Sequence, residues 1–224
     1  MQLVRPSIEF LEMTSEPLMT IECAGRTCYK SEERMIDGHS SKEFVRMLLK
    51  RGHEAMIEHA YASYRVVCDR GVTHEIVRHR LCSYAQESTR YCNYSGGVTF
   101  IIPRWMGMIE GEYLVNILRR TVHVNGVLKS WHFSSPETTW LESMTHCEEA
   151  YKSLLADKWT PQQARSVLPN SLKTEIVITT NLREWRHFFK LRTAKAAHPQ
   201  MREVADMLLK DMRERIPVIF EDVE

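Results

Sequence analysis

The sequence predicts an α+β fold, in which strands and helices are interleaved irregularly along the chain. Residues 61–68 and 173–180 alternate along the chain and are rich in β-branched or aromatic side chains, as strands are. Residues 136–157 and 182–192 instead space their apolar side chains at helical intervals. Because no repeat or linker rich in Pro, Gly and Ser interrupts the sequence, we expect a single compact domain over residues 1–224, with a mixed or antiparallel sheet flanked by helices.

The first half of the chain contains two expected helices before the strand at 61–68. Residues 16–27 form the first helix, and Ser40 or Ser41 can cap the second, which Gly52 ends because glycine tolerates a left-handed conformation. After this strand we expect a turn at 69–71 and a short helix at 73–78. Two short strands are expected around a turn at 95–97, the second of them at 98–102, and a helix at 113–120. The last element of this half is a hairpin of strands 121–124 and 127–131, because its Asn125-Gly126 pair suits a type I′ turn.

The second half is expected to be helical around the strand at 173–180. Thr160 can cap a short helix that Pro169 ends, Asn181 can cap the helix that runs to residue 192, and a last helix covers residues 203–215. The helix after Asn181 has two stripes at spacings of three and four. The apolar stripe belongs to the core and consists of Leu182, Trp185, Phe188 and Phe189. The basic stripe is either a solvated face or an anion-binding wall and consists of Arg183, His187 and Lys190.

The composition argues against several classes of protein. The formal net charge is only +1, so no overall positive charge favours a nucleic-acid-binding surface. No apolar run approaches the roughly 20 residues that span a bilayer, and no secretory signal is visible at the N-terminus. The six cysteines form no Cys-x-x-Cys pair, which indicates free thiols in a reducing compartment. We therefore expect a cytoplasmic protein that binds neither nucleic acid nor a membrane.

Standard nucleotide-binding and metal-binding motifs are absent from the sequence. None of the nine glycines belongs to a dinucleotide fingerprint or a P-loop. His74 and Glu75 begin a sequence like the zinc-binding HExxH motif, but Arg78 stands where the second histidine is required. His53 and His59 are six residues apart, which places them on different faces of a helix. We therefore expect no metal site.

The most informative segment covers residues 78–91. It begins with three consecutive basic residues, whose side chains point in different directions whether the segment is helical or extended. In an extended segment Ser88 and Arg90 project to the same face, where a hydroxyl and a guanidinium can clamp a phosphate. A solvated basic edge is the alternative, since runs of charge usually face solvent. The residues alone leave both interpretations open.

This segment resembles the flavin-dependent thymidylate synthases, which are marked by Arg-His-Arg, seven residues and then Ser. The same spacing here joins Arg78-His79-Arg80 to Ser88. The resemblance covers residues 20–215 and implies the fold of the thymidylate synthase-complementing proteins. Its further matches, in order along the chain, are Gly52-His53-Glu54, Glu58-His59, Ala164-Arg165, Leu168-Pro169, Thr174, Asn181-Leu182-Arg183 and Leu191-Arg192.

The resemblance implies an enzyme that methylates deoxyuridine monophosphate (dUMP) reductively to dTMP, for dTTP synthesis. It also implies bound FAD, NADPH as reductant, 5,10-methylenetetrahydrofolate as one-carbon donor, and a homotetramer whose subunits share the sites. Arg192 matches the arginine that polarises the pyrimidine, so it is the candidate catalytic residue. The implied dUMP-binding residues are Glu75, Arg78, Gln86, Glu87, Ser88, Thr89, Arg90, Arg165 and Arg192.

The implied FAD-binding residues come from several separate parts of the sequence. Two positions depart from the family pattern: Ala55 stands where some relatives have a hydroxyl residue, and Glu75 where some have Gln. A carboxylate offers only hydrogen-bond acceptors, whereas an amide also donates, so Glu75 requires a different partner. The implied FAD-binding set is His53, Ala55, Glu58, Arg78, His79, Arg80, Gln86, Asn181, Arg183 and His187.

Two other classes of function stay open. Cys82 lies close to Arg80, which could lower the pKa of its thiol and make it a nucleophile, although a small buried packing residue is the commoner role. Arg, Tyr and His also interleave in residues 78–91, as they do on nucleic-acid-binding surfaces. Thymidylate formation by a Cys82→Ala variant would exclude the first class, and a lack of salt-sensitive nucleic-acid binding would exclude the second.

Overall fold

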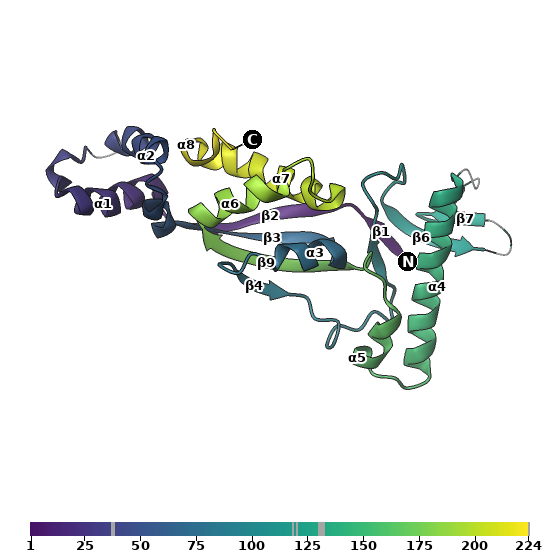
Figure 1. Cartoon of the computed structure of the whole chain (residues 1–224). Coiled ribbons are helices and arrows are strands. Elements are labelled where there is room, and N and C mark those ends of the chain that lie inside the picture. Colours follow the sequence, from purple (N-terminus) through teal and green to yellow (C-terminus); the bar gives the residue numbers. More distant parts are fainter. Residues whose placement is uncertain (37–38, 118, 120, 130–132, 224) are drawn as a thin grey trace. The chain divides into compact units, whose positions relative to one another are not determined.

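The chain folds into two compact units, each built from strands and helices, which confirms the α+β class (Figure 1). The assignment of all residues to one domain stays a prediction. The computed structural model describes residues 1–36, 39–117, 119, 121–129 and 133–223. Unit 1 consists of Met1–Pro6, Val67–His74 and Gln86–Glu175, and unit 2 of Ser7–Val66, Glu75–Ala85 and Ile176–Glu224.

Unit 1 is organised around a five-stranded mixed sheet with the order β5-β1-β6-β7-β8. β1 runs parallel to β5, and the remaining neighbours are antiparallel. The long helix α4 (Ser135–Ala156) lies alongside β6 and β7, and Leu141 and Tyr151 of this helix are fully buried in the core of the unit (Figure 1). The strands are β1 (Gln2–Val4), β5 (Thr99–Ile101), β6 (Gly111–Asn116), β7 (Thr121–Val124) and β8 (Val127–Lys129).

The hairpin of β7 and β8 confirms the turn prediction. Asn125 and Gly126 have φ of 51° and 77°, and two positive φ angles are what a type I′ turn requires. Residues 130 and 131, which complete the predicted second strand, lie outside the described residues. α4 also begins and ends within one residue of the predicted range, and Ser134 with Glu137 forms a capping box at its start.

The predicted helix at 113–120 is wrong, because β6 occupies its first part. Burial alternates there: Tyr113 is buried and Leu114 exposed, and each pairs with a residue of β7. The apolar spacing of so short a segment fits both periodicities, and the pairing partner decides between them. Residues 118 and 120 lie outside the described residues.

Two other local predictions in this part of the chain need correction. Residues 69–71 do not form a separate turn, because α3 (Arg70–Ile76) begins directly after the strand; the Asp69 carboxylate accepts a hydrogen bond from the Val72 N–H at 2.8 Å and so caps the helix. No strand lies within residues 87–98, all of which are described, so the turn at 95–97 precedes β5 without following a strand.

Most of unit 2 is formed by a four-stranded sheet, with the order β2-β3-β9-β4, and by the helices around it. α6 (Leu182–Arg192) and α7 (Pro199–Arg215) lie along one face of this sheet (Figure 1). α7 begins four residues before the predicted start, since Pro199 is favourable at the first position of a helix. The strands are β2 (Ser7–Met13), β3 (Tyr61–Asp69), β4 (Ser83–Gln86) and β9 (Lys173–Asn181).

The remaining helices of unit 2 include α1 and α2, which pack against each other. Ser40 is the first residue of α2 rather than its cap: its Oγ accepts from the Ile36 N–H and donates to the Glu22 carboxylate, both at 2.9 Å. Gly52 follows α2 with a φ of 69°, as predicted. These helices are α1 (Pro17–Tyr29), η1 (Glu32–Arg34), α2 (Ser40–Lys50), η2 (Glu54–His59) and α8 (Pro217–Phe220).

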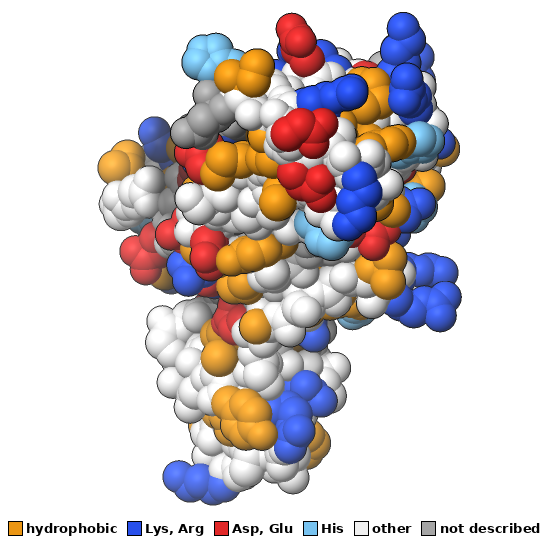
Figure 2. All heavy atoms as spheres, turned by 90° about the vertical axis from the view of Figure 1, so that its left-hand side faces the viewer, with side chains coloured by type: hydrophobic (Ala, Val, Ile, Leu, Met, Phe, Trp, Pro, Cys, Tyr) orange, Lys and Arg blue, Asp and Glu red, His pale blue; other side chains and the backbone are white. Residues whose placement is uncertain are grey.

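The end of unit 2 that carries α1 and α2 shows acidic and basic side chains intermixed with apolar ones (Figure 2). In unit 1, α5 (Pro161–Ala164) and η3 (Arg165–Val167) form the predicted short helix, and Thr160 with Gln163 caps it. Charged residues of both signs occur in the sequences of α1 and α2, which explains the mixed surface. Thr160-Pro161 is a common way for a helix to begin, which explains the start of α5.

The contact of α1 with α2 depends on Gly25. A Cβ at this position would lie 2.5 Å from the ring of Phe44, which is buried. We expect Gly25→Val to reduce the free energy of unfolding by about 1–3 kcal/mol through overpacking. Ala24→Val is the matched control, because it adds the same β-branched side chain to the same helix and should cost only about 0.6 kcal/mol. Urea titrations of both variants measure the difference, and equal losses would contradict the close packing.

Candidate functional site

The position of α6 fixes the candidate site of unit 2. The Asn181 side chain accepts a hydrogen bond from the Glu184 N–H at 2.8 Å and caps the helix as predicted. The apolar stripe is confirmed, because Trp185 and its apolar neighbours are at most 1% exposed. Burying this stripe on one side leaves the opposite, basic stripe free to line a cavity. The stripe's three members, Arg183, His187 and Lys190, all do so.

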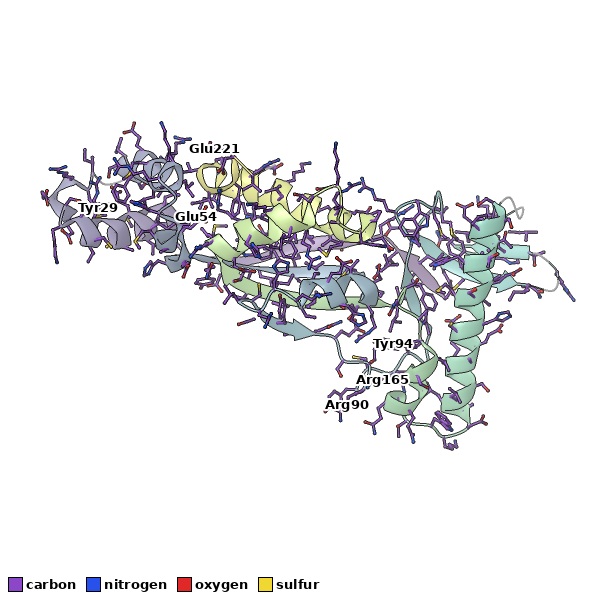
Figure 3. The ribbon with its side chains drawn as sticks, viewed as in Figure 1. Tyr29, Glu54, Arg90, Tyr94, Arg165 and Glu221 are labelled. Atoms are coloured by element: carbon purple, nitrogen blue, oxygen red, sulfur yellow. The ribbon has the colours of Figure 1, made fainter. Side chains whose placement is uncertain are left out.

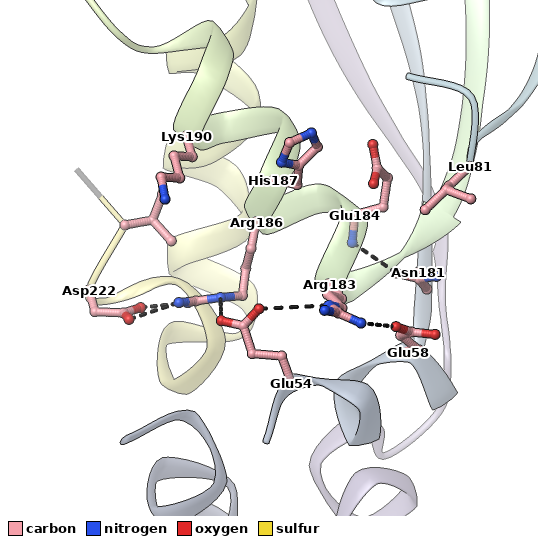
Figure 4. A pocket seen from close by; sticks show the side chains of 11 residues that line it. Glu54, Glu58, Leu81, Asn181, Arg183, Glu184, Arg186, His187, Lys190 and Asp222 are labelled. Atoms are coloured by element: carbon pink, nitrogen blue, oxygen red, sulfur yellow. Dashed lines mark hydrogen bonds and ion pairs between the residues drawn. The ribbon is translucent and has the colours of Figure 1, made fainter. Parts of the chain in front are cut away.

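The cavity beside α6 has a volume of about 750 Å³, within the range of small-molecule sites (Figure 4). Both of its arginines are already paired with carboxylates. The Arg183 guanidinium contacts the Glu58 and Glu54 carboxylates. Arg186 binds both carboxylate oxygens of Asp222 and lies 3.8 Å from Glu54. The cavity therefore offers both cations and carboxylates to a ligand.

The cavity brings together only part of the predicted FAD-binding set. Four members line it, namely Glu58, Asn181, Arg183 and His187. His53 and Ala55 are exposed and do not line it, and the His53 Nδ1 is hydrogen-bonded to the Tyr29 hydroxyl at 2.9 Å. The exposed Arg78 and Arg80 and the buried His79 do not line it either, and Gln86 belongs to unit 1. The sequence prediction missed Glu54, Leu81, Glu184, Arg186, Asp222 and Val223 as lining residues.

The spacing of charges could have indicated some of the missed residues. Arg183 and Arg186 are three apart in α6 and share one side of that helix. Glu54 and Glu58 have the spacing of one turn of an α-helix, although they belong to the 3-10 helix η2. Asp222 lies far along the chain from both pairs, and no local pattern indicates its contact with Arg186.

A chain of four polar residues, Glu75, Arg192, His79 and Glu184, adjoins the cavity through Glu184. The Arg192 Nη1 donates to the Glu75 carboxylate at 2.8 Å, and its Nη2 donates to the Glu75 carbonyl at 2.9 Å. Its Nε donates to the His79 Nε2 at 3.1 Å. The His79 Nδ1 lies 3.0 Å from the Glu184 carboxylate. Arg192 is thus held by three contacts, and Glu75 finds in it the cationic partner that a carboxylate requires.

His79, Glu184 and His187 lie close enough together to be considered as metal ligands. However, both ring nitrogens of His79 already have hydrogen-bond partners, and one of these is the Arg192 guanidinium. A cation here would meet that positive charge and would have to displace it. The donor set therefore fits a hydrogen-bonded chain better than a metal site.

Unit 1 contains the predicted phosphate-binding residues. Arg165 donates from Nη1 to the buried Thr89 hydroxyl at 3.1 Å, and the Arg90 N–H donates to the Ser88 Oγ at 3.3 Å. Arg90 and Arg165 lie at the same end of the unit (Figure 3). Within the described part of unit 1, neither arginine has a carboxylate partner within 4.0 Å, so both remain available to an anion.

Glu87 and Gln86, the other predicted dUMP-binding residues of unit 1, have protein partners. The Glu87 carboxylate accepts from the Tyr94 hydroxyl at 2.7 Å and from the Lys173 Nζ at 3.2 Å, and its N–H donates to the Glu175 carbonyl. The Gln86 amide donates to the hydroxyls of Thr73 and Thr174. Both side chains therefore support the backbone that leads to Ser88.

No helix within the described residues is long and apolar enough to span a membrane.

A family model described as thymidylate synthase complementing protein matches residues 9–218. The flavin-dependent thymidylate synthase of Corynebacterium aurimucosum is 33% identical over 213 residues, which cover 94% of this chain and 82% of that protein. The chain belongs to the flavin-dependent thymidylate synthase family. The enzyme of the same name from Geobacter sulfurreducens is 30% identical over 222 residues, which cover 96% of this chain and 85% of that protein.

Solved structures share the fold of this chain. The UMP/dUMP methylase PolB from Streptomyces cacaoi, bound with 5-Br dUMP, has a TM-score of 0.74 and 25% identity, over 99% of this chain and 96% of that one. Thymidylate Synthase X from Helicobacter pylori, with FAD and dUMP, has a TM-score of 0.72 and 22% identity, over 97% and 98% of the two chains. The second likeness shows the fold, which confirms the predicted fold type.

The surroundings of Cys82 do not activate it as the alternative, cysteine-dependent class of synthase requires. Burial raises the pKa of this thiol, and hydrogen bonds with Tyr84 and Thr180 offset the rise only in part. A thiol with a raised pKa is a poorer source of thiolate at neutral pH. Cys82 therefore fits a packing role in this flavin-dependent thymidylate synthase.

The buried position of His79 predicts a loss of stability at acidic pH. Burial lowers the pKa of His79 and Arg192 lowers it further, although Glu184 opposes them. Because the unfolded chain takes up this proton near pH 6.5, the contribution of neutral His79 is complete above about pH 6.5 and is lost as the pH falls toward the folded-state pKa. Between about pH 7.5 and pH 5.5, the free energy of unfolding should therefore fall more in the wild type than in His79→Gln. Urea titrations measure this difference, and parallel losses would refute it.

Proposed function

We propose that this flavin-dependent thymidylate synthase activates its pyrimidine substrate with Arg192 and holds the substrate phosphate with Ser88, Arg90 and Arg165. The enzyme methylates dUMP reductively to dTMP, with FAD as its cofactor. The observation that carries the proposal for Arg192 is its three-point anchorage to Glu75 and His79. A guanidinium fixed at all three nitrogens is already oriented before a substrate arrives.

Arg192 has donors left for a ligand. A guanidinium carries five N–H groups, of which three are used in the contacts with Glu75 and His79, so one remains on each terminal nitrogen. Carbon 5 of uracil is a poor nucleophile unless the ring takes on enolate character, with negative charge developing on a carbonyl oxygen. Free N–H groups of a fixed cation stabilise this activated, enolate-like form more than the neutral ground state. No protein nucleophile is needed for this activation.

The phosphate of dUMP is proposed to bind in unit 1. Arg90 and Arg165 lack carboxylate partners among the described residues of that unit, and Ser88 adds a hydroxyl. Two guanidinium groups can neutralise a phosphate dianion and donate to it in pairs. Glu87, Thr89 and Gln86 then support the loop.

The further dUMP contacts, Glu75 and Arg78, belong to unit 2. Family resemblance supports a homotetramer, in which Arg78 of one subunit faces the phosphate held by Ser88 and Arg90 of another. It also supports NADPH and 5,10-methylenetetrahydrofolate as co-substrates. A cytoplasmic location is supported by the six cysteines, all of which are free thiols.

The cavity beside α6 suits part of FAD. Its cations, Arg183, His187 and Lys190, can hold a pyrophosphate, and its carboxylates, Glu58 and Asp222, can accept hydrogen bonds from ribose hydroxyls. Bound FAD supplies the hydride chemistry of the reaction. The other members of the predicted FAD-binding set are proposed to contact FAD as well, and of these only Asn181 lines this cavity among the described residues. The set's other members are His53, Ala55, Arg78, His79, Arg80, Gln86 and Asn181.

The phosphate site predicts a selective loss of nucleotide affinity. We expect the visible spectrum of the purified enzyme to show bound flavin and to shift on titration with dUMP. Arg90→Ala should raise the dissociation constant about 10- to 100-fold, since it removes a charge-assisted hydrogen bond. Arg104→Ala, an exposed arginine of the same unit, is the control and should leave it unchanged. Unaltered affinity in Arg90→Ala would remove the phosphate site, and failure to bind any flavin would remove the proposed cofactor site.

The activation role of Arg192 predicts a loss of turnover. Arg192→Ala should reduce kcat at saturating dUMP about 100-fold, which corresponds to about 3 kcal/mol of lost transition-state stabilisation. Cys82→Ala is the control and should keep kcat near the wild-type value, because no thiolate is needed. Initial rates of dTMP formation measure both variants. Near-normal turnover by Arg192→Ala would overturn the assignment, and loss of turnover in Cys82→Ala would favour the cysteine-dependent class.

A further inference from the structure

Glu184 is a buried carboxylate to which the proposed function gives no role. It is 6% exposed, and its neighbour in α6 is the fully buried Trp185. A buried carboxylate is costly unless it is paired or hydrogen-bonded. The His79 Nδ1, at 3.0 Å, is the hydrogen-bond partner of its carboxylate among the described residues.

Helix capping does not explain the direction of the Glu184 side chain. Glu184 is the third residue of α6, where a glutamate commonly reaches back to the backbone N–H of the capping residue. Glu137 of α4 and Gln163 of α5 form such capping boxes in unit 1, but in α6 only the Asn181 side chain takes part in the cap. The Glu184 carboxylate is turned to His79 instead.

The contacts of His79 determine which of its nitrogens carries the proton. The Arg192 Nε can only donate, so the His79 Nε2 at 3.1 Å must be the acceptor and must be unprotonated. The proton of neutral His79 therefore lies on Nδ1 and is donated to Glu184. The opposite tautomer would set two N–H groups against each other at Arg192 and leave the buried carboxylate without a donor.

We infer that Glu184 is a positioning residue, which fixes the tautomer of His79 and thereby the orientation of the Arg192 guanidinium toward the pyrimidine. The inference rests on the proposed role of Arg192. Without the His79 contact, Arg192 keeps only its two bonds to Glu75, a side chain that is 29% exposed. The guanidinium then loses the contact at Nε, and its free N–H groups lose their fixed direction.

The groups that face His79 also predict how its protonation acts. Glu184, Arg192 and His187 surround the ring, and the His187 ring lies 5.7 Å from it. A proton on Nε2 would remove the acceptor for Arg192 and place a second positive charge beside it. Turnover should therefore fall on the acid side as His79 becomes protonated. Burial lowers the pKa of His79, and the Glu184 charge opposes this shift and so moves the acid limb to higher pH.

Two variants of Glu184 separate positioning from simple packing. Glu184→Leu keeps the volume but cannot accept the Nδ1 proton, and kcat at saturating dUMP, measured per bound flavin, should fall about 10- to 100-fold. Glu184→Gln can still accept it, so kcat at its optimum should stay within about threefold of wild type. Because Gln carries no charge, the acid limb of its kcat–pH profile should move to lower pH.

The tautomer is measured independently of activity by the ¹⁵N chemical shifts of histidine-labelled protein, with His79→Asn used to assign the signal. We expect protonated Nδ1 in the wild type and in Glu184→Gln, and loss of that state in Glu184→Leu. Protonated Nε2 in the neutral wild type, or wild-type kcat in a folded Glu184→Leu, would overturn the inference. If Glu184→Leu does not fold, an unmoved acid limb in Glu184→Gln overturns it.

The same set of rates distinguishes this inference from the proposed function. If Arg192→Ala keeps full turnover, the activation role fails and the positioning role fails with it. If Arg192→Ala loses turnover while the folded Glu184→Leu does not, only the positioning role fails. Loss of turnover in both, together with the expected tautomer shift, supports both.

Discussion

The burial of one side of α6 is the constraint on which the site of unit 2 depends. Trp185, Phe188 and Phe189 are packed in the core, and rotation of the helix would expose them at a cost of several kcal/mol. The basic stripe is therefore held toward the cavity and Glu184 toward His79. Because the Asn181 cap fixes where the helix begins, the cap and the apolar stripe together place Arg192 in its last turn.

Sequence patterns predicted most elements that are determined locally. The Asn181 cap, the Asn125-Gly126 turn and the long helix α4 need only their own neighbours. The strand β6 was missed because pairing with β7, rather than its own periodicity, decides its form. The start of α3 was misplaced because one Asp69 side chain replaces the predicted turn with a cap.

Residues of the candidate site could be predicted where they belong to the family motif. They could not be predicted where a contact joins distant parts of the chain. The Arg-His-Arg motif identifies His79, and the polar stripe indicates Arg183, His187 and Lys190. The link between His79 and Glu184 crosses 105 positions, and that between Arg186 and Asp222 crosses 36. Such pairs depend on how the helices and strands pack against one another, which the pattern of a single sequence does not reveal.

The paired arginines of the cavity affect how an anionic ligand can enter it. Arg183 and Arg186 already hold Glu58 and Asp222, so at the proposed cofactor site a ligand phosphate would displace a carboxylate from an arginine instead of neutralising a free cation. Few counterions are released in such an exchange, so the affinity of this cavity should depend only weakly on ionic strength. Arg90 and Arg165 have no carboxylate partner among the described residues of unit 1, so the affinity of an anion at the proposed phosphate site should depend more strongly on salt.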